Sequence, residues 1–244
     1  MSLKGKSVLV TGGARRIGHE IALTMASGGA DVAITYRSSA TDARKTVADL
    51  KAYNVQVLAL SCDLHREKSI AAALADVKEK FGGLDILVNN AGAYDTIDFE
   101  KITAQQWDEM FATNTRAPFL MSRLAAPMLR ERKGRIINIG SLGGLRAWAS
   151  HAHYCASKAA LVMLTQVTAK ALAPAVSVNC VAPGMIGTGA CEETAFLRQV
   201  AQKTAMKRAG TPAEVAAAVL FFASGPHFIT GQVLAVDGGL GLQS

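Results

Sequence analysis

The stretch "SVLVTGGARRIG", residues 7–18, decides the fold of this chain. Residues 7–10 form a short apolar run of the kind that becomes a buried strand. Glycines follow at positions 12, 13 and 18, and a helix is predicted to begin near Ile17. Backbone N–H groups and the positive end of that helix would face one point, which suits a pyrophosphate. A plain strand-to-helix turn explains these glycines alone equally well.

The same alternation of short apolar runs and longer helical segments continues along the chain. Strands are predicted over residues 7–10, 31–35, 55–60, 86–89, 135–139, 176–181 and 232–236. Helices are predicted over residues 17–27, 42–53, 67–81, 104–113, 118–131, 154–172, 191–204 and 212–223. Thr211, Pro212 and Glu214 predict a capping box at the start of the last helix. Most strands lack polar alternation, so we expect an α/β fold with one doubly wound parallel sheet and a single domain over residues 1–244.

Composition excludes several classes of function. The 244 residues carry a net charge of +7, half are hydrophobic and 18% are charged, which is typical of a globular chain. We find no block of like charges and no uncharged apolar stretch of 18 residues, so neither nucleic acid nor a membrane is an expected partner. The cysteines lack C-x-x-C spacing, so we expect no metal site and a reduced, cytoplasmic setting; they are Cys62, Cys155, Cys180 and Cys191.

The residues just after each strand should carry the chemistry, because such sheets bind ligands at the carboxyl ends of their strands. "YCASK" places Tyr154 and Lys158 four residues apart, on one face of a helix. Ser141 follows a predicted strand thirteen residues upstream. A phenol beside an ammonium and a hydroxyl can act as a proton donor, because the nearby positive charge lowers its pKa.

Taken together, the motifs resemble the short-chain dehydrogenase/reductase family over the whole chain, in order. The matching features are "TGGARRIG", Asp63, "NNAG" (89–92), Asn114, Ser141, "YCASK" (154–158), "PGMIGT" (183–188) and "ITGQVLAVDGG" (229–239). The resemblance implies a Rossmann fold of seven parallel strands in the order 3-2-1-4-5-6-7. It also implies a homotetramer.

The resemblance also implies roles for a catalytic set. Tyr154 would be the general acid/base, and Ser141 would hydrogen-bond the substrate carbonyl oxygen. Lys158 would lower the pKa of Tyr154 and hold the nicotinamide ribose. Asn114 would organise a water that joins Lys158 to solvent; a helix-interior Asn bonded to backbone is the alternative.

A cofactor cleft follows from the same resemblance. Asp63 would accept a hydrogen bond from the adenine amino group, although a strand-end Asp that caps the next helix is an alternative. Thr188 and the backbone at Ile186 would bind the carboxamide. The remaining cleft residues would be Gly12, Ile17, Gly18, Leu64, Asn90, Ala91, Gly92, Pro183 and Gly184, with Tyr154 and Lys158 also touching the cofactor.

Two arginines indicate NADPH rather than NADH. NAD-preferring Rossmann enzymes place an acidic residue after the second strand, whereas an arginine there suits a 2′-phosphate. The chain has no acidic residue between Asp31 and Asp42. Arg15 and Arg37 could therefore clamp the phosphate with their planar donor forks, and Ser38 would add a hydroxyl.

Arg16 departs from the family pattern, which has glycine at this position. An arginine here is compatible with helical backbone angles but would place a long cation over the cofactor. The pteridine reductases of the family show the same substitution, and in them this arginine reaches both pyrophosphate and pterin. Ser141 and "PGMIGT" (183–188) are instead more similar to 3-oxoacyl-acyl-carrier-protein reductases.

The substrate side is predicted more coarsely. Residues 189–206 are expected to form a lid. His151 and His153 are expected in a loop that lines the pocket. Other side chains expected to shape it are Tyr94, Leu142, Trp148 and Met185.

The leading hypothesis is an NADPH-dependent carbonyl reductase that acts on a 3-oxoacyl thioester, with acyl carrier protein as one conceivable partner. The alternatives are a pteridine or other small-molecule carbonyl reductase, and a non-catalytic NADP-sensing protein. The intact set of Asn114, Ser141, Tyr154 and Lys158 argues against the sensor, which needs none of them.

Overall fold

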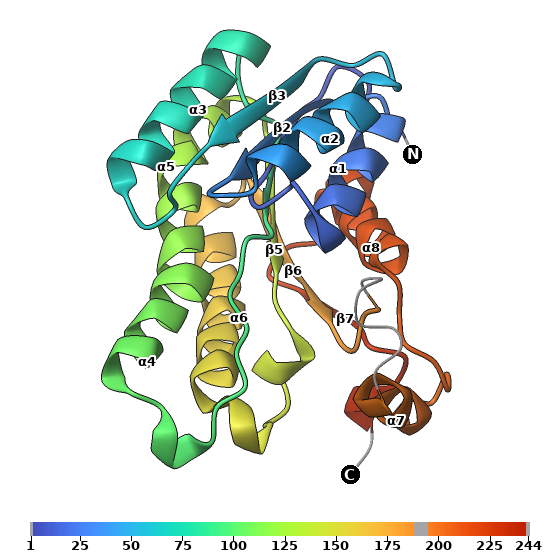
Figure 1. Cartoon of the computed structure of the whole chain (residues 1–244). Coiled ribbons are helices and arrows are strands. Elements are labelled where there is room, and N and C mark those ends of the chain that lie inside the picture. Colours follow the sequence, from blue (N-terminus) through green and yellow to red (C-terminus); the bar gives the residue numbers. More distant parts are fainter. Residues whose placement is uncertain (1, 188–194, 243–244) are drawn as a thin grey trace.

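The computed structural model describes residues 2–187 and 195–242, and within them one parallel sheet has the order β3-β2-β1-β4-β5-β6-β7 (Figure 1). Its strands are β1 (Ser7–Val10), β2 (Asp31–Tyr36), β3 (Val57–Ser61), β4 (Ile86–Asn89), β5 (Arg135–Ile139), β6 (Ser177–Pro183) and β7 (Val233–Val236). Strand β1 pairs with β2 on one side and with β4 on the other. The predicted strand order is therefore confirmed.

Helices cover both faces of this sheet (Figure 1). They are α1 (Arg16–Ser27), α2 (Ala40–Lys51), α3 (Glu67–Phe81), α4 (Ala104–Phe111), α5 (Ala117–Glu131), α6 (Ala152–Leu172), α7 (Ala195–Lys203) and α8 (Pro212–Ser224). One core packs α1, α2 and α8 against the sheet, with Ile21 and Val219 fully buried in it. A second core packs α3, α5 and α6 against the other face, around Leu87 and Met121. Burial on both faces explains why the strands lack polar alternation.

Two predicted helix boundaries are corrected in the region that carries the site. Helix α6 begins at Ala152, so His153 lies in its first turn and is buried, not in a loop. Helix α4 ends at Phe111, where the chain passes into a π-helical turn, Ala112–Arg116. Such turns inside helices are frequent at functional sites because they re-aim one side chain.

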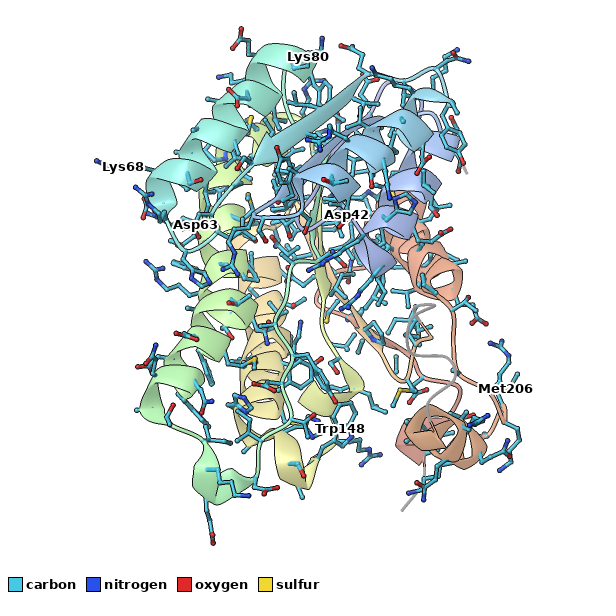
Figure 2. All side chains as sticks on the ribbon, viewed as in Figure 1. Asp42, Asp63, Lys68, Lys80, Trp148 and Met206 are labelled. Atoms are coloured by element: carbon cyan, nitrogen blue, oxygen red, sulfur yellow. The ribbon has the colours of Figure 1, made fainter. Side chains whose placement is uncertain are left out.

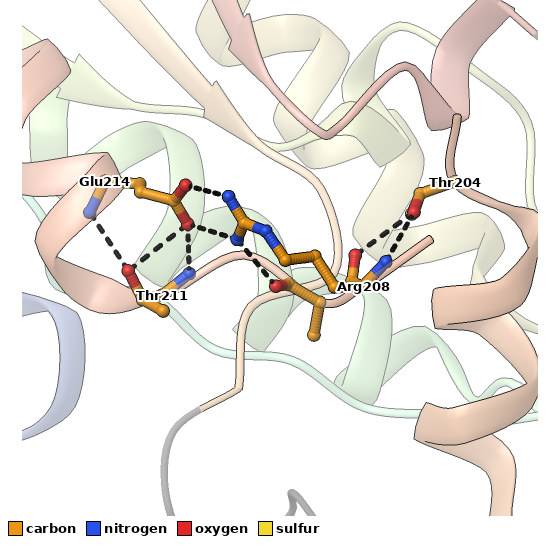
Figure 3. A network of polar contacts seen from close by, with 5 residues as sticks. Thr204, Arg208, Thr211 and Glu214 are labelled. Carbon is orange, nitrogen blue, oxygen red and sulfur yellow. Dashed lines mark hydrogen bonds and ion pairs between the residues drawn. The ribbon is translucent and has the colours of Figure 1, made fainter. Parts of the chain in front are cut away.

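The capping box predicted at the start of α8 is confirmed, and Arg208 extends it (Figure 3). The Glu214 carboxylate accepts hydrogen bonds from Thr211 N at 2.8 Å and from both Arg208 terminal nitrogens at 2.9 and 2.5 Å. These bonds hold the pKa of Glu214 well below its usual range, at about 2. Arg208 is tied in turn to Thr204, so the network joins the end of α7 to the start of α8. Of the predicted lid, residues 189–194 lie outside the described residues.

Three negative findings concern residues 2–187 and 195–242 alone. No helix there combines the length and apolar character needed to cross a membrane. No group of three or more His, Cys, Asp or Glu side chains there could hold a metal ion. Cys62, Cys155 and Cys180 are free thiols, and Cys191 lies outside this part of the chain.

Candidate active site

Ser141 and Tyr154 meet at the carboxyl edge of the sheet. Ser141 lies two residues beyond the carboxyl end of β5. Tyr154 and Lys158 lie one turn apart on α6. All three are buried. The Ser141 side chain hydrogen-bonds to the Tyr154 oxygen, and its Oγ accepts a hydrogen bond from Gly143 N at 3.0 Å. The structure thus brings the predicted proton donor and the predicted carbonyl-binding hydroxyl together.

The expected lowering of the Tyr154 pKa is not what the structure gives. Burial raises the pKa of Tyr154 to about 12, and the Ser141 hydrogen bond opposes that rise only in part. The Lys158 ammonium is not among the causes of the shift. Removing a phenol from water disfavours its charged form, and here that effect is the larger one. Tyr154 is therefore protonated at neutral pH, which is the state that a proton donor needs.

Lys158 has a perturbed pKa of its own. Its Nζ donates a hydrogen bond to Ile139 O at 2.8 Å, at the last residue of β5. Burial lowers the pKa of Lys158 to about 8, and the charge interaction with the nearby Cys180 thiol opposes that shift. An ammonium has three N–H groups. A Cβ placed on Gly92 would lie 3.5 Å from Nζ, so the glycine leaves space beside the ammonium.

Asn114 lies within the π-helical turn, and its side chain is fully buried. Its Oδ1 accepts a hydrogen bond from Ala93 N at 2.8 Å. Its Nδ2 donates to Ala93 O and to Ser157 Oγ, both at 3.0 Å. A Cβ on Gly92 would lie 3.2 Å from Oδ1, so Asn114 and Lys158 border the same glycine.

Ser157 is a site residue that the sequence reasoning missed. Its Oγ accepts from Asn114 and donates to Tyr154 O at 2.7 Å, which links the π-helical turn to α6. The signal for it was a serine inside "YCASK", three residues after Tyr154, where an exposed helix position would favour a longer side chain. Its complete burial gives the serine a positioning role.

The glycine loop fits against the loop after β4. Gly12 has a positive φ of 62°, and a Cβ there would lie 3.1 Å from Ala91 Cα. A Cβ on Gly18 would collide with Gly12 O and Asn90 Nδ2. Asn90 Nδ2 donates to Thr11 O at 2.9 Å and Gly12 O at 3.2 Å, which fixes the two loops together. The small size of these glycines is thus what allows the two loops to pack closely.

Three arginines belong to this region. Arg15 is the N-cap residue of α1, Arg16 is its first residue, and Arg37 follows β2. All three are exposed. Within the part of the chain that the structure describes, none of their guanidinium groups has an ion pair or hydrogen bond. The two predicted clamp residues, Arg15 and Arg37, therefore carry uncompensated positive charge beside the loop, and the exposed Ser38 follows directly.

Arg16 does not adopt a helical backbone, although an arginine is compatible with one. Its φ is 53°, in the left-handed region that favours glycine. The loop thus imposes a conformation that suits glycine, although the residue is arginine. A left-handed residue with a side chain costs roughly 1–2 kcal/mol. The cost indicates that the Arg16 side chain, and not its backbone, is the reason for its presence.

The remaining predicted cofactor residues take the following places. Asp63 follows β3 (Figure 2), and its Oδ1 accepts from His65 N at 3.0 Å. The alternative that Asp63 caps the next helix is wrong, because α3 begins at Glu67 with Arg66 at the cap position. Ile17, Leu64 and Ile186 are partly buried against the two cores, and Pro183 ends β6. Gly184 N donates to Val236 O at 2.9 Å, and Thr188 lies outside the described residues.

The substrate side carries a group of aromatic side chains. Trp148 and His151 come from the loop between β5 and α6, which Figure 2 marks with Trp148. Tyr94 comes from the loop after β4, and its ring meets Tyr154 edge-on with centroids 5.0 Å apart. The Tyr94 and Trp148 rings thus contact the Tyr154 ring, and His151 contacts both of them, whereas His153 is buried in α6.

A family model described as Enoyl-(Acyl carrier protein) reductase matches residues 12–241. The chain belongs to the short-chain dehydrogenase/reductase family. A 3-oxoacyl-[acyl-carrier-protein] reductase FabG of Staphylococcus epidermidis is 35% identical over 241 residues, covering 96% of this chain and 98% of that protein. An L-fucose dehydrogenase of Oryctolagus cuniculus is 37% identical, covering 98% of this chain and 86% of that protein.

Solved structures of family members share the complete fold. A short-chain dehydrogenase of Burkholderia cenocepacia, solved in complex with NADP, superposes with a TM-score of 0.93 at 38% identity. The superposition covers 98% of this chain and 99% of that one. These relatives differ in substrate, so the family establishes an oxidoreductase and leaves the substrate to the residues around the site.

Proposed function

We propose that this protein reduces the carbonyl group of a 3-oxoacyl thioester with NADPH. One observation carries the proposal: the hydrogen-bonded pair of Ser141 and Tyr154 lies on the same edge as Lys158 and Asn114, which both border Gly92. The relatives named 3-oxoacyl-[acyl-carrier-protein] reductases support the choice of substrate class.

The residues present fit such a cofactor, because the glycine loop leads into the N-terminus of α1, which suits a pyrophosphate, and the arginines beside it are unpaired within the described chain. Arg15 and Arg37 would hold the 2′-phosphate, and Asp63 the adenine. Lys158 would hold the ribose through N–H groups that Ile139 does not use. When bound, the dihydronicotinamide supplies a hydride to the carbonyl carbon.

The chain's own groups then account for the proton. Ser141 would hold the carbonyl oxygen, and Tyr154 would donate its proton to that oxygen. The high pKa of Tyr154 keeps the proton available at neutral pH. The second lone pair of Asn114 Oδ1 would hold a water that returns a proton from solvent through Lys158.

Arg16 supports a second candidate, a pteridine reductase. Its strained backbone and unpaired guanidinium suit a residue that contacts a ligand. If the substrate is a pterin, Arg16 would hydrogen-bond a ring oxygen. If it is an acyl thioester, Arg16 has only the pyrophosphate to hold.

The test is kcat/KM for dihydrobiopterin and for an acetoacetyl thioester, in the parent and in Arg16→Gly. The thioester function requires turnover of the acetoacetyl compound and no more than a cofactor-level effect of the substitution. A selective loss on dihydrobiopterin of roughly 5- to 150-fold, the range for a buried polar atom left unpaired, would replace it by the pterin function.

A homotetramer is part of the same proposal. Its support is a set of apolar side chains that one chain leaves exposed on its outer helices and on the edge strand β7: Phe119, Met163, Val167 and Leu234. The carrier of the thioester would be acyl carrier protein or a smaller thiol.

A further inference from the structure

Four rings meet around the reactive hydroxyl. Tyr94 lies perpendicular to Tyr154, with an interplanar angle of 87° and ring centroids 5.0 Å apart. Trp148 is nearly parallel to Tyr154, at 15° and 6.3 Å. His151 contacts both neighbours, at 5.2 Å from Tyr94 and 5.6 Å from Trp148. We call Tyr94, Trp148 and His151 the aromatic wall.

Hydrogen bonds hold the wall in place. His151 Nε2 lies 2.7 Å from the Tyr94 hydroxyl and 3.0 Å from Thr96 Oγ1. The backbone bond from Ile97 N to Ser150 O, 3.0 Å long, ties the two loops that supply the rings. The wall is thus fixed before any substrate arrives, so a ligand that packs on it loses little freedom of the protein.

Trp148 packs against the loop that follows Ser141. A Cβ on Gly143 would lie 3.1 Å from the Trp148 ring and 3.3 Å from Cys155 Sγ. The indole therefore packs directly on the backbone at Gly143, two residues after Ser141. Its position is coupled to the loop that holds the substrate-binding hydroxyl.

The wall also keeps an open side. Tyr94 is 57% exposed although it contacts two other rings, whereas Tyr154 behind it is 9% exposed. Burial lowers the pKa of His151, and the neighbouring His153 lowers it further, while Asp95 opposes the shift. The imidazole is thus neutral at neutral pH, and the wall offers rings and hydroxyls rather than a net charge.

We propose that the preferred substrate carries an aromatic ring on its reacting carbonyl carbon, as a 3-aryl-3-oxoacyl compound does. The inference rests on the proposed carbonyl reductase function and narrows its substrate class. Aromatic pairs in edge-to-face or offset geometry gain affinity beyond the apolar area that they bury, roughly threefold to tenfold per pair. A flexible saturated chain or ring gains only the affinity that comes from burying its apolar area.

The reaction stays balanced for such a substrate. The C=O bond becomes CH–OH: carbon gains the hydride of NADPH, oxygen gains the Tyr154 proton, and NADP⁺ and the secondary alcohol are released. Solvent returns one proton to Tyr154.

The experiment compares two esters that differ only in the ring, ethyl benzoylacetate and ethyl 3-cyclohexyl-3-oxopropanoate. NADPH oxidation gives kcat/KM for both, and calorimetry gives their Kd for the protein loaded with NADP⁺. The expected result is a preference of at least about tenfold for the phenyl ester in both measurements. The parent protein supplies this comparison, so no variant needs to fold.

Variants then assign the preference to the wall. Trp148→Leu and Tyr94→Leu should bring the two esters towards parity, whereas Tyr94→Phe, which keeps the ring, should retain the preference. Trp107→Leu is the matched control, because Trp107 stacks on Phe111 at the end of α4 and does not contact Tyr154. A preference that survives both leucine substitutions would overturn the role of the wall.

The outcomes separate this inference from the proposed function. Equal kcat/KM and equal Kd would overturn the aromatic preference and leave the reductase standing. Tighter binding of the phenyl ester without turnover of any 3-oxo compound would support the wall and overturn the reductase. Absence of both turnover and preferential binding would overturn both.

Discussion

The candidate catalytic centre and the arginines near the glycine loop lie on the same edge of the sheet but are built in opposite ways. Tyr154, Lys158 and Asn114 are buried, and each has hydrogen-bond partners within the fold. Arg15 and Arg37 are exposed and unpaired within the described chain. The centre is assembled by folding, at the cost of desolvating an ammonium and a phenol. The exposed arginines cost little folding free energy, because their charges stay in water, and they remain open to an anionic ligand.

Tyr154→Phe gives the largest expected effect and can break this comparison. We expect turnover to fall by roughly 10³-fold, since positioned acids contribute about 10²–10⁴. The Kd for NADPH should stay unchanged, because the phenol acts on the reacting oxygen. The rate of NADPH oxidation measures turnover, and fluorescence titration measures the Kd for NADPH. Tyr53→Phe, at an exposed site beyond α2, is the control and should keep full turnover. Turnover retained in Tyr154→Phe would refute the assignment.

Arg37→Asp tests the exposed arginines, which are the second region of this comparison. The substitution should lower kcat/KM with NADPH roughly 10- to 100-fold, because a charge-assisted hydrogen bond is lost and a repulsion is added. Efficiency with NADH should stay level or rise, and the melting temperature should not change. Arg44→Asp, an equal charge change on α2, is the control. Equal efficiency of the parent with NADPH and NADH would remove the basis for the phosphate clamp.

Lys158→Met tests whether burial of the Lys158 ammonium destabilises the folded protein. The folded chain releases the Lys158 proton near pH 8, whereas the unfolded chain holds it to about pH 10.5. The unfolded state binds more protons between these values, so this lysine destabilises the fold below pH 8 and the penalty fades as pH rises. From pH 7.5 to pH 9.5, the free energy of unfolding of the parent should rise by about 2 kcal/mol relative to that of Lys158→Met. Urea unfolding at both pH values measures it; a constant difference would contradict the lowered pKa.

The sequence predicted the catalytic set because its spacing is local. Tyr154 and Lys158 share a face of one helix whatever lies around them, and a strand end fixes Ser141 in a parallel sheet. The same local logic predicted the strand bounds of β1, β4 and β5, where continuous apolar runs end at Gly, Asn or Thr. The strand order came from the family resemblance.

Other features depended on contacts between distant segments. The phenol pKa was expected to fall beside Lys158, but the structure buries Tyr154 and raises its pKa to about 12. Helical backbone angles are compatible with an arginine at position 16, yet the loop holds Arg16 at a φ of 53°. Burial and loop strain are set by what packs against a residue from elsewhere in the chain, and spacing along the sequence carries no record of either.

By itself, the sequence determined the parallel sheet, and it predicted the edge on which the chemistry lies and the residues of the proton donor. Periodicity and loop motifs determine these because each depends on neighbours within a few residues. Only the tertiary structure decided that Ser157 joins Asn114 to α6 and that Tyr94 and Trp148 face Tyr154 from two separate loops. The contacts of Asn114 with Ser157 and of Tyr94 with Tyr154 join segments tens of residues apart, so they exist only once the sheet has brought its strand ends to one edge.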